Sequence, residues 1–196
     1  MSYPRGLSKG GFSLIELIVS IAISGIALSA VTTTFVSQSQ SYDVQEQIVE
    51  MQQNARAAMD IITREVRMAG FDPTGAGFTG VHYHSGYIHI RADLNGDGDK
   101  DDTNEDLRYR YDSTNKLIER DDDDWNNWTL LVENIQAFNF DYLDRNSNPT
   151  TTSTDIRQIQ ITINARTAER DVNYPLNDGY QTYRLTSLVT PRNLAY

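Results

Sequence analysis

The chain has 196 residues and a formal net charge of −10, with 39% hydrophobic and 22% charged residues. This composition suits one ordinary domain with an appended segment, and it is too apolar for a disordered chain. The acidic balance argues against nucleic acid as a partner, because binding phosphate needs a basic surface. The absence of cysteine excludes disulfides, thiolate metal sites and cysteine nucleophiles.

The first predicted element is an apolar segment over residues 12–36, FSLIELIVSIAISGIALSAVTTTFV, in which Glu16 is the only charge. A run of this length exceeds the roughly 20 residues that are needed to cross a bilayer. Arg5 and Lys9 precede it, with no acid among the first eleven residues. Positive residues favour the cytoplasmic side, so the segment predicts a single membrane pass with the rest of the chain exported.

The stretch GFSLIELIVSIAISG, which begins at Gly11, resembles the class III leader of type IV prepilins. The resemblance implies that a prepilin peptidase cuts between Gly11 and Phe12 and methylates the new amino group of Phe12. Glu16 then becomes the fifth mature residue, and its carboxylate pairs with the amine of a neighbouring subunit. The alternative is a plain signal anchor with a stray acid near its end.

A polar helix is predicted to continue this segment as far as residue 70. Small and apolar residues follow one another at steps of three and four, which marks one face of an α-helix. This stripe consists of Val44, Ile48, Met51, Ala55, Ala58, Ile62, Val66 and Ala69. Gly70 and Pro73 end the helix.

The end of this helix, EMQQNARAAMDIITREVRMAGFDP over residues 50–73, resembles PilW-type minor pilins and, more loosely, the J-type pseudopilin of type II secretion. The resemblance implies the type IV pilin fold, an α+β fold with one long N-terminal helix packed on an antiparallel β-sheet head. The expected parts are a removed leader (1–11), a membrane and filament-core helix (12–36), its amphipathic continuation (37–72) and the head (73–196).

Short β-type segments fill the head after a glycine-rich connector. The predicted strands cover residues 81–92, 107–111, 116–120, 134–143, 156–164 and 180–190. No helix-length periodic segment lies between them, so neighbouring strands are expected to pair antiparallel in a sheet whose inner face receives the helical stripe.

The acidic loop over residues 93–106, DLNGDGDKDDTNED, holds seven acids against one lysine. Its opening fits the D-x-[DN]-x-[DN]-G pattern of a calcium loop, in which alternate side chains supply hard oxygens and a glycine allows the turn. We predict a structural calcium site whose ligands are Asp93, Asn95, Asp97, Asp99, Asp101 and Glu105. The alternative is a solvated acidic hairpin tip, because the twelfth position is Asn104 where a calcium loop of this type has glutamate.

Two weaker patterns lie in the head. His82 and His84 could face a zinc ion from one strand face, but no third ligand is evident and ordinary histidines are favoured. Trp125 and Trp128 could form a sugar or partner patch, and more often such residues cap a core edge. No nucleophile, phosphate-loop or dinucleotide motif is present, so we predict no enzyme.

These patterns together predict a PilW-like minor pilin that takes part in pilus assembly and priming. Its expected partners are the prepilin peptidase, other minor pilins, the major pilin and, before assembly, inner-membrane lipid. The head is expected in the periplasm and later on the pilus or cell surface. Two alternatives stay open: a J-type pseudopilin, and a signal-anchored calcium-binding adhesin that does not polymerise.

Overall fold

A computed structural model describes residues 11–122 and 127–194 of the chain. The predicted leader, apart from Gly11, and the predicted Trp125 patch lie outside these residues. The chain forms two compact units, residues 1–45 and residues 46–196, and each is described by itself.

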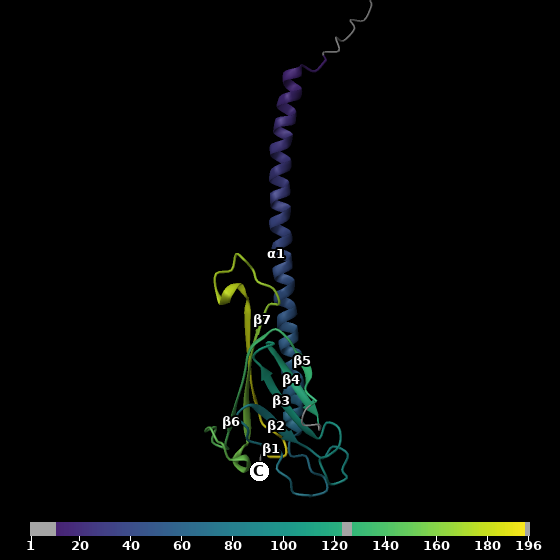
Figure 1. Cartoon of the computed structure of the whole chain (residues 1–196), viewed down its shortest axis with the longest axis vertical. Helices are drawn as coiled ribbons and strands as arrows, with labels where there is room; N and C mark the ends of the chain where they lie inside the picture. Colours follow the sequence, from purple (N-terminus) through teal and green to yellow (C-terminus); the bar gives the residue numbers. More distant parts are fainter. Residues whose placement is uncertain (1–10, 123–126, 195–196) are drawn as a thin grey trace, which may run out of the picture. The chain divides into compact units, whose positions relative to one another are not determined.

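The single long helix, α1, runs over Leu14–Met68 (Figure 1). It begins and ends two residues inside the predicted limits of 12 and 70. Gly70 follows with φ +77°, the left-handed conformation that ends many helices and that glycine adopts without strain.

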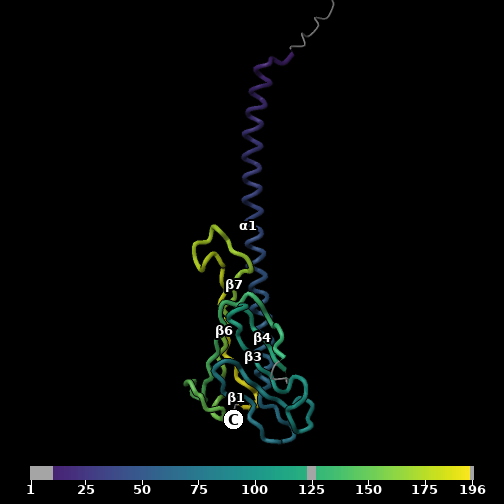
Figure 2. Tube along the Cα trace, viewed as in Figure 1, coloured from purple at the N-terminus to yellow at the C-terminus, as the bar shows by residue number. Residues whose placement is uncertain are grey.

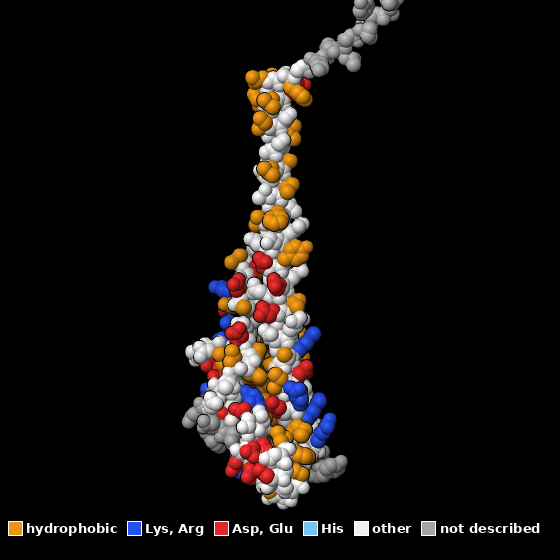
Figure 3. All heavy atoms as spheres, turned by 90° about the vertical axis from the view of Figure 1, so that its right-hand side faces the viewer, with side chains coloured by type: hydrophobic (Ala, Val, Ile, Leu, Met, Phe, Trp, Pro, Cys, Tyr) orange, Lys and Arg blue, Asp and Glu red, His pale blue; other side chains and the backbone are white. Residues whose placement is uncertain are grey.

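In the first unit, many large apolar side chains of α1 are exposed, among them Ile15, Ile21 and Phe35, and they lie among small polar residues (Figure 3). The helix contains an 18-residue window with a mean hydropathy of 2.3, none of which is buried. By length and composition this part is apolar enough to cross a membrane.

The second unit combines the rest of α1 with two antiparallel sheets. The first sheet has the order β1-β2-β3-β4-β5 and the second β6-β7-β8. Their strands are β1 (Val81–His82), β2 (Tyr87–Arg91), β3 (Asp106–Asp112), β4 (Leu117–Asp122), β5 (Thr129–Val132), β6 (Ile135–Leu143), β7 (Gln158–Arg166) and β8 (Thr182–Val189). In Figure 1, both sheets lie beside the second half of α1.

The core of the second unit lies between this part of α1 and the two sheets. All members of the predicted stripe from Met51 to Ala69 are buried, and Ile48 is partly buried against them. Across from the helix, Ile159, Ile161 and Ile163 of β7 are fully buried, as their alternation predicts. The predicted class, α+β with one long N-terminal helix and antiparallel sheets, is confirmed.

The head differs from the expected strand pattern in three respects. The predicted strand 81–92 is a hairpin, because residues 83–86 turn back and pair β1 with β2. A further strand, β5, was not predicted. The strands form two sheets where one was expected, because Asn134, with φ +60°, turns the chain between β5 and β6.

Three long connections lie at the two ends of this unit (Figure 2). The acidic loop 93–105 and the connection 144–157 lie at the end where α1 finishes, and the connection 167–181 lies at the other end. One such connection contains a short 3-10 turn over Ser153–Asp155, and another contains one over Asn177–Gly179.

Candidate functional site

The predicted cleavage point lies just before α1. Gly11 and Phe12 are both exposed, and the side chain of Phe12 is 93% accessible. A Cβ atom added to Gly11 would meet no other atom within 4 Å. The peptide bond between them is therefore open to an enzyme, and cleavage there stays a prediction.

Glu16 takes part in the first turn of α1. Its Oε2 accepts a hydrogen bond from the backbone N–H of Ser13 at 2.8 Å, and the hydroxyl of Ser13 accepts one from the N–H of Glu16 at 3.3 Å. This reciprocal pair is a capping box, which satisfies two backbone donors that a helix leaves free at its start. We did not anticipate it, although the spacing S-x-x-E is visible at residues 13–16.

Hydroxyl groups along the apolar part of α1 are bonded within the helix. The side chains of Ser20, Ser29 and Thr33 donate to the carbonyl four residues earlier at 2.7–2.9 Å. In hydrocarbon a polar group needs such an internal partner. These hydroxyls are therefore no obstacle to a membrane location.

The acidic loop is a ladder of side-chain-to-backbone hydrogen bonds. Asn95 Oδ1 accepts the N–H of Asp97, Asp97 Oδ1 accepts that of Asp99, and Asp99 Oδ1 accepts that of Asp101, at 2.9–3.1 Å. Asn and Asp favour such local turns. The regular spacing points alternate side chains into one small region, as a calcium loop requires.

Two of the predicted ligands are buried at the base of the loop. Asp93 is fully buried and accepts the N–H groups of Gly96 and Gly98 at 2.6 and 3.0 Å. Glu105 is 2% exposed, and its Oε1 accepts the N–H groups of Leu94 and Asn95 at 2.7 and 3.2 Å. Both carboxylates thus hold the loop closed. Glu105 Oε2 is buried and has no hydrogen-bond partner in the described part of the chain.

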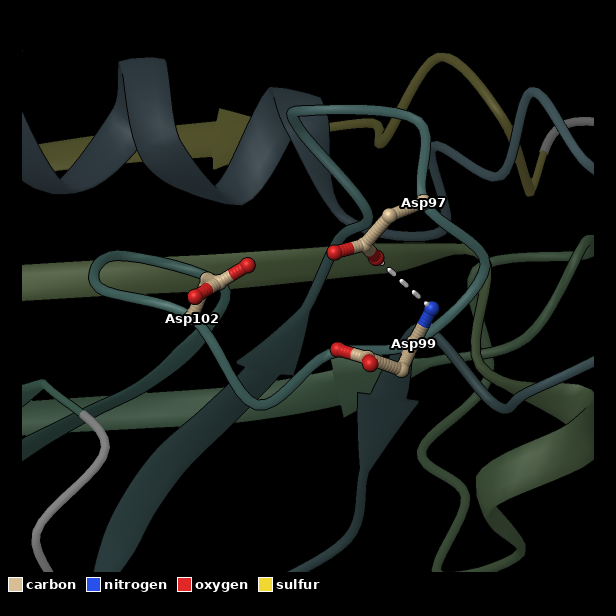
Figure 4. Close-up of side chains that lie close together, drawn as sticks. All are labelled: Asp97, Asp99 and Asp102. Atoms are coloured by element: carbon tan, nitrogen blue, oxygen red, sulfur yellow. Dashed lines mark hydrogen bonds between the residues drawn. The ribbon is translucent and has the colours of Figure 1, made fainter.

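Three exposed carboxylates converge above this base (Figure 4). One oxygen each of Asp97, Asp99 and Asp102 lies within 4.8 Å of the others. The amide nitrogen of Asn95 donates to Asp97 at 3.0 Å and to Asp102 at 2.6 Å. Asp102 was not predicted as a ligand, whereas the predicted Asp101 lies outside the group and faces Lys100 at 3.4 Å.

Hydrogen bonds favour the ionised form of one acid in this group. The backbone N–H of Asp99 and the amide of Asn95 lower the pKa of Asp97. Ionised carboxylates this close together repel one another, and a divalent cation relieves that repulsion. Oxygen ligands at this density suit calcium and not a thiolate- or imidazole-seeking metal.

The histidines and Trp128 make ring contacts instead of a metal site. His82 stacks on His89 with 4.9 Å between ring centres, and His84 stacks on Tyr87 at 3.5 Å. The guanidinium of Arg110 lies 4.0 Å from the ring centre of Trp128. Within residues 11–122 and 127–194, the acids of Figure 4 form the one cluster with metal-ligand geometry.

A buried ionic network crosses β2, β3 and β4, and the sequence did not reveal it. Asp106 contacts His89 at 2.7 Å, Arg91 at 2.8 Å and Arg108 at 2.9 Å. Arg108 also reaches the fully buried Asp121 at 3.1 Å. Burial opposes ionisation of Asp106, but the hydrogen bonds from His89 and Arg91 and the charge of Arg108 lower its pKa to about 2. This network joins the three strands β2, β3 and β4.

Two family models match the sequence. The model of the prokaryotic N-terminal methylation motif matches residues 7–32. The model described as prepilin peptidase-dependent protein B matches residues 44–184. No curated protein matches the chain.

Among solved structures, the chain is similar to a type IV-like pilin from Thermus thermophilus. The two share 12% identity over 73% of this chain and 97% of the other, with a TM-score of 0.47.

Proposed function

Because the chain belongs to the prepilin peptidase-dependent protein B family of type IV pilin-like proteins, we propose that it is a minor pilin-like subunit that takes part in pilus assembly and priming. Membership of this family confirms two predictions, that the chain is a type IV pilin-family protein and that it is structural and not an enzyme, whereas the PilW type stays a prediction. The observation that carries the proposal is the methylation motif over residues 7–32, placed directly on an exposed apolar helix.

The proposed sequence of events starts in the inner membrane. The prepilin peptidase cuts between Gly11 and Phe12 and methylates Phe12, which creates an ammonium group at the start of α1. Glu16 lies four residues further along, in a segment where an unpaired charge is costly. In a bundle of such helices, the carboxylate of Glu16 pairs with the amine of a neighbouring minor or major pilin.

This model also gives the location of the parts. The apolar part of α1 holds the subunit in lipid before assembly, with the head in the periplasm. After assembly the same exposed apolar surface packs on neighbouring helices, and the head stands on the fibre or at the cell surface. The apolar side chains of this part of α1 have no packing partner among the described residues, so a bundle in which neighbouring helices cover them suits this helix.

Mass spectrometry of the chain purified from the membrane fraction tests the proposal. We expect a first residue of methylated Phe12, and an unprocessed chain when Gly11 is replaced by valine. An intact Met1, or a cut beyond Val36, would overturn it. Replacement of Glu46 by glutamine, at an exposed position of the same helix, should leave processing unchanged.

Partners distinguish a pilin from the two alternatives. A J-type pseudopilin would be processed alike but would co-purify with secretion-system subunits instead of pilins. An adhesin that does not polymerise would co-purify with neither. Crosslinking in intact cells followed by identification of the linked proteins therefore separates the three, and capture of pilins supports the proposal.

We also propose that the acidic loop 93–106 binds a structural calcium ion. The three converging carboxylates and the ladder of turns below them support this proposal. Calorimetric titration of the mature chain with calcium tests the proposal, with magnesium as the comparison ion. Binding of calcium without comparable binding of magnesium is expected, since magnesium requires a smaller and stricter geometry. No heat of binding at millimolar calcium would overturn it.

A further inference from the structure

A groove of about 360 Å³ lies beside the end of β6, in the second unit. Its walls come from the turn after β1, from β6 itself and from the connection 149–151. The volume lies in the range of ligand pockets, and the groove belongs neither to the N-terminal region nor to the acidic loop. It therefore needs an explanation of its own.

β6 is an edge strand, and its free edge borders this groove. It pairs only with β7, in a register that places Tyr142 opposite Ile159 and Phe140 opposite Ile161. The carbonyl of Tyr142 accepts the N–H of Thr150, which lies on the side away from β7. Backbone groups of residues two apart in a strand point to the same side, so those of Phe140 point there too.

Some backbone donors and acceptors on this side of β6 have no hydrogen-bond partner. Among the described residues, no partner is found for the N–H and C=O of Phe140, whereas Thr150 already lies opposite Tyr142. Such a row along a strand edge is a template for another extended chain. Paired N–H and C=O groups at strand spacing match a peptide backbone better than they match an isolated ion or an apolar body.

The chain itself already seats an extended segment on this edge. Leu143 and Pro149 form an antiparallel bridge, and Thr150 donates to Tyr142 at 2.9 Å. The pairing stops there, because the chain turns away into the 3-10 helix over Ser153–Asp155. The slot beside Phe140 is the continuation of a pairing that the edge is shown to accept.

The groove walls add selectivity for side chains. The ring of Tyr83 is 39% exposed and meets the ring of Tyr142 edge-on at 5.4 Å, and Phe140 contacts Tyr142 at 5.6 Å. A hydrogen bond of 3.0 Å from the N–H of Tyr83 to Ser153 fixes one wall. The lining contains one acid, Asp141, and no lysine or arginine. An occupant with apolar and basic side chains is favoured over an acidic one.

We propose that the free edge of β6 binds an extended, neutral or basic peptide segment of a partner protein by strand addition. The N–H and C=O of Phe140 provide the backbone hydrogen bonds, and the aromatic wall accepts an apolar side chain. This inference does not depend on the pilus role, since it concerns the head alone.

Amide NMR of the mature chain in phosphatidylcholine nanodiscs tests the inference. The probe is a nonapeptide of alternating threonine and valine with a lysine at each end. We expect it to shift the amide signal of Phe140 and to protect this amide from hydrogen exchange. The same peptide N-methylated at every peptide bond has no donors for the edge and should bind at least tenfold more weakly.

Two variants refine the test. Asp141→Lys should weaken binding of the lysine-ended peptide at least threefold, whereas Asn139→Lys, at an exposed position on the same strand outside the groove lining, should change it less. Three results would overturn the inference: no shift at Phe140 at millimolar peptide, equal binding of the methylated peptide, or equal shifts caused by the neutral disaccharide maltose.

Discussion

Glu16 accepts a hydrogen bond from the N–H of Ser13, and Ser13 accepts one from the N–H of Glu16, so the two residues close the first turn of α1. Glu16 therefore has a role inside its own chain as well as the proposed role between chains. The first depends on an acceptor oxygen and the second on a charge. Glutamine keeps the acceptor and removes the charge, so one substitution separates the two roles.

We expect both Glu16→Gln and Glu16→Ala to be inserted and cleaved but left out of fibres and minor-pilin complexes. Charge pairing with a neighbour's amine requires the carboxylate, which both variants lack. The measurement is the amount of the subunit in sheared fibres and in crosslinked complexes. If Glu16→Gln assembles as the unchanged chain does and only Glu16→Ala fails, the cap and not the charge is what matters.

Much of the fold followed from periodicity in the sequence. The stripe from Met51 to Ala69 and the alternation of β7 each bury one face, so the pattern reports the packing directly. β5 escaped because it has four residues and only Val132 is buried, which leaves no alternation to detect. The division into two sheets depends on the turn at Asn134, and hairpin patterns do not show where a sheet ends.

The candidate sites were predicted less completely, for a physical reason. Asp97 and Asp99 were found from loop spacing, but Asp102 approaches them only through the turn that follows. The buried network of Asp106 and Arg108 was not predicted because charged residues on a short strand are usually exposed. In the structure, opposite charges on three strands neutralise one another in the interior. Such pairing depends on which residues of neighbouring strands lie opposite one another. The sequence pattern within one strand does not contain that information.

Calcium should stabilise the mature chain against heat, and the effect should depend on Asp97. At calcium a hundredfold above the dissociation constant, the gain in free energy of unfolding is about 2.7 kcal/mol. In Asp97→Asn the gain should largely vanish, and without calcium this variant should be no more stable than the unchanged chain, because the lowered pKa of Asp97 means that the fold already favours its ionised carboxylate. Thermal unfolding with calcium and with a chelator measures both effects, and Asp155→Asn, an exposed acid outside the loop, is the control. An equal response of Asp97→Asn and the unchanged chain would contradict the proposed site.

Gly80→Ala should destabilise the head by about 1–3 kcal/mol, because overpacking forces the backbone to move. A Cβ atom on Gly80 would overlap the backbone of Gly70, just after α1. Gly86→Ala is the matched control, since its Cβ atom would meet only the ring of His84, at 3.6 Å. Urea unfolding of the mature chain in micelles should show a change within about 0.5 kcal/mol for the control. Equal stability of the two variants would show that the backbone at Gly80 and Gly70 can move apart without a loss of stability.

His82→Gln should make the stability of the head less sensitive to acid. Burial, together with the charges of Arg91 and His89, lowers the pKa of His82 from 6.5 to about 4. Between these two values the unfolded chain binds a proton at this residue and the folded chain does not, so the free energy of unfolding falls as the pH falls. Glutamine does not titrate but can still accept the hydrogen bond that Arg91 donates to His82 at 2.9 Å. Urea unfolding at several pH values across this window should therefore give a shallower decline for His82→Gln, and a smaller change for the exposed His84→Gln. An unchanged decline in His82→Gln would show that other groups carry the acid sensitivity.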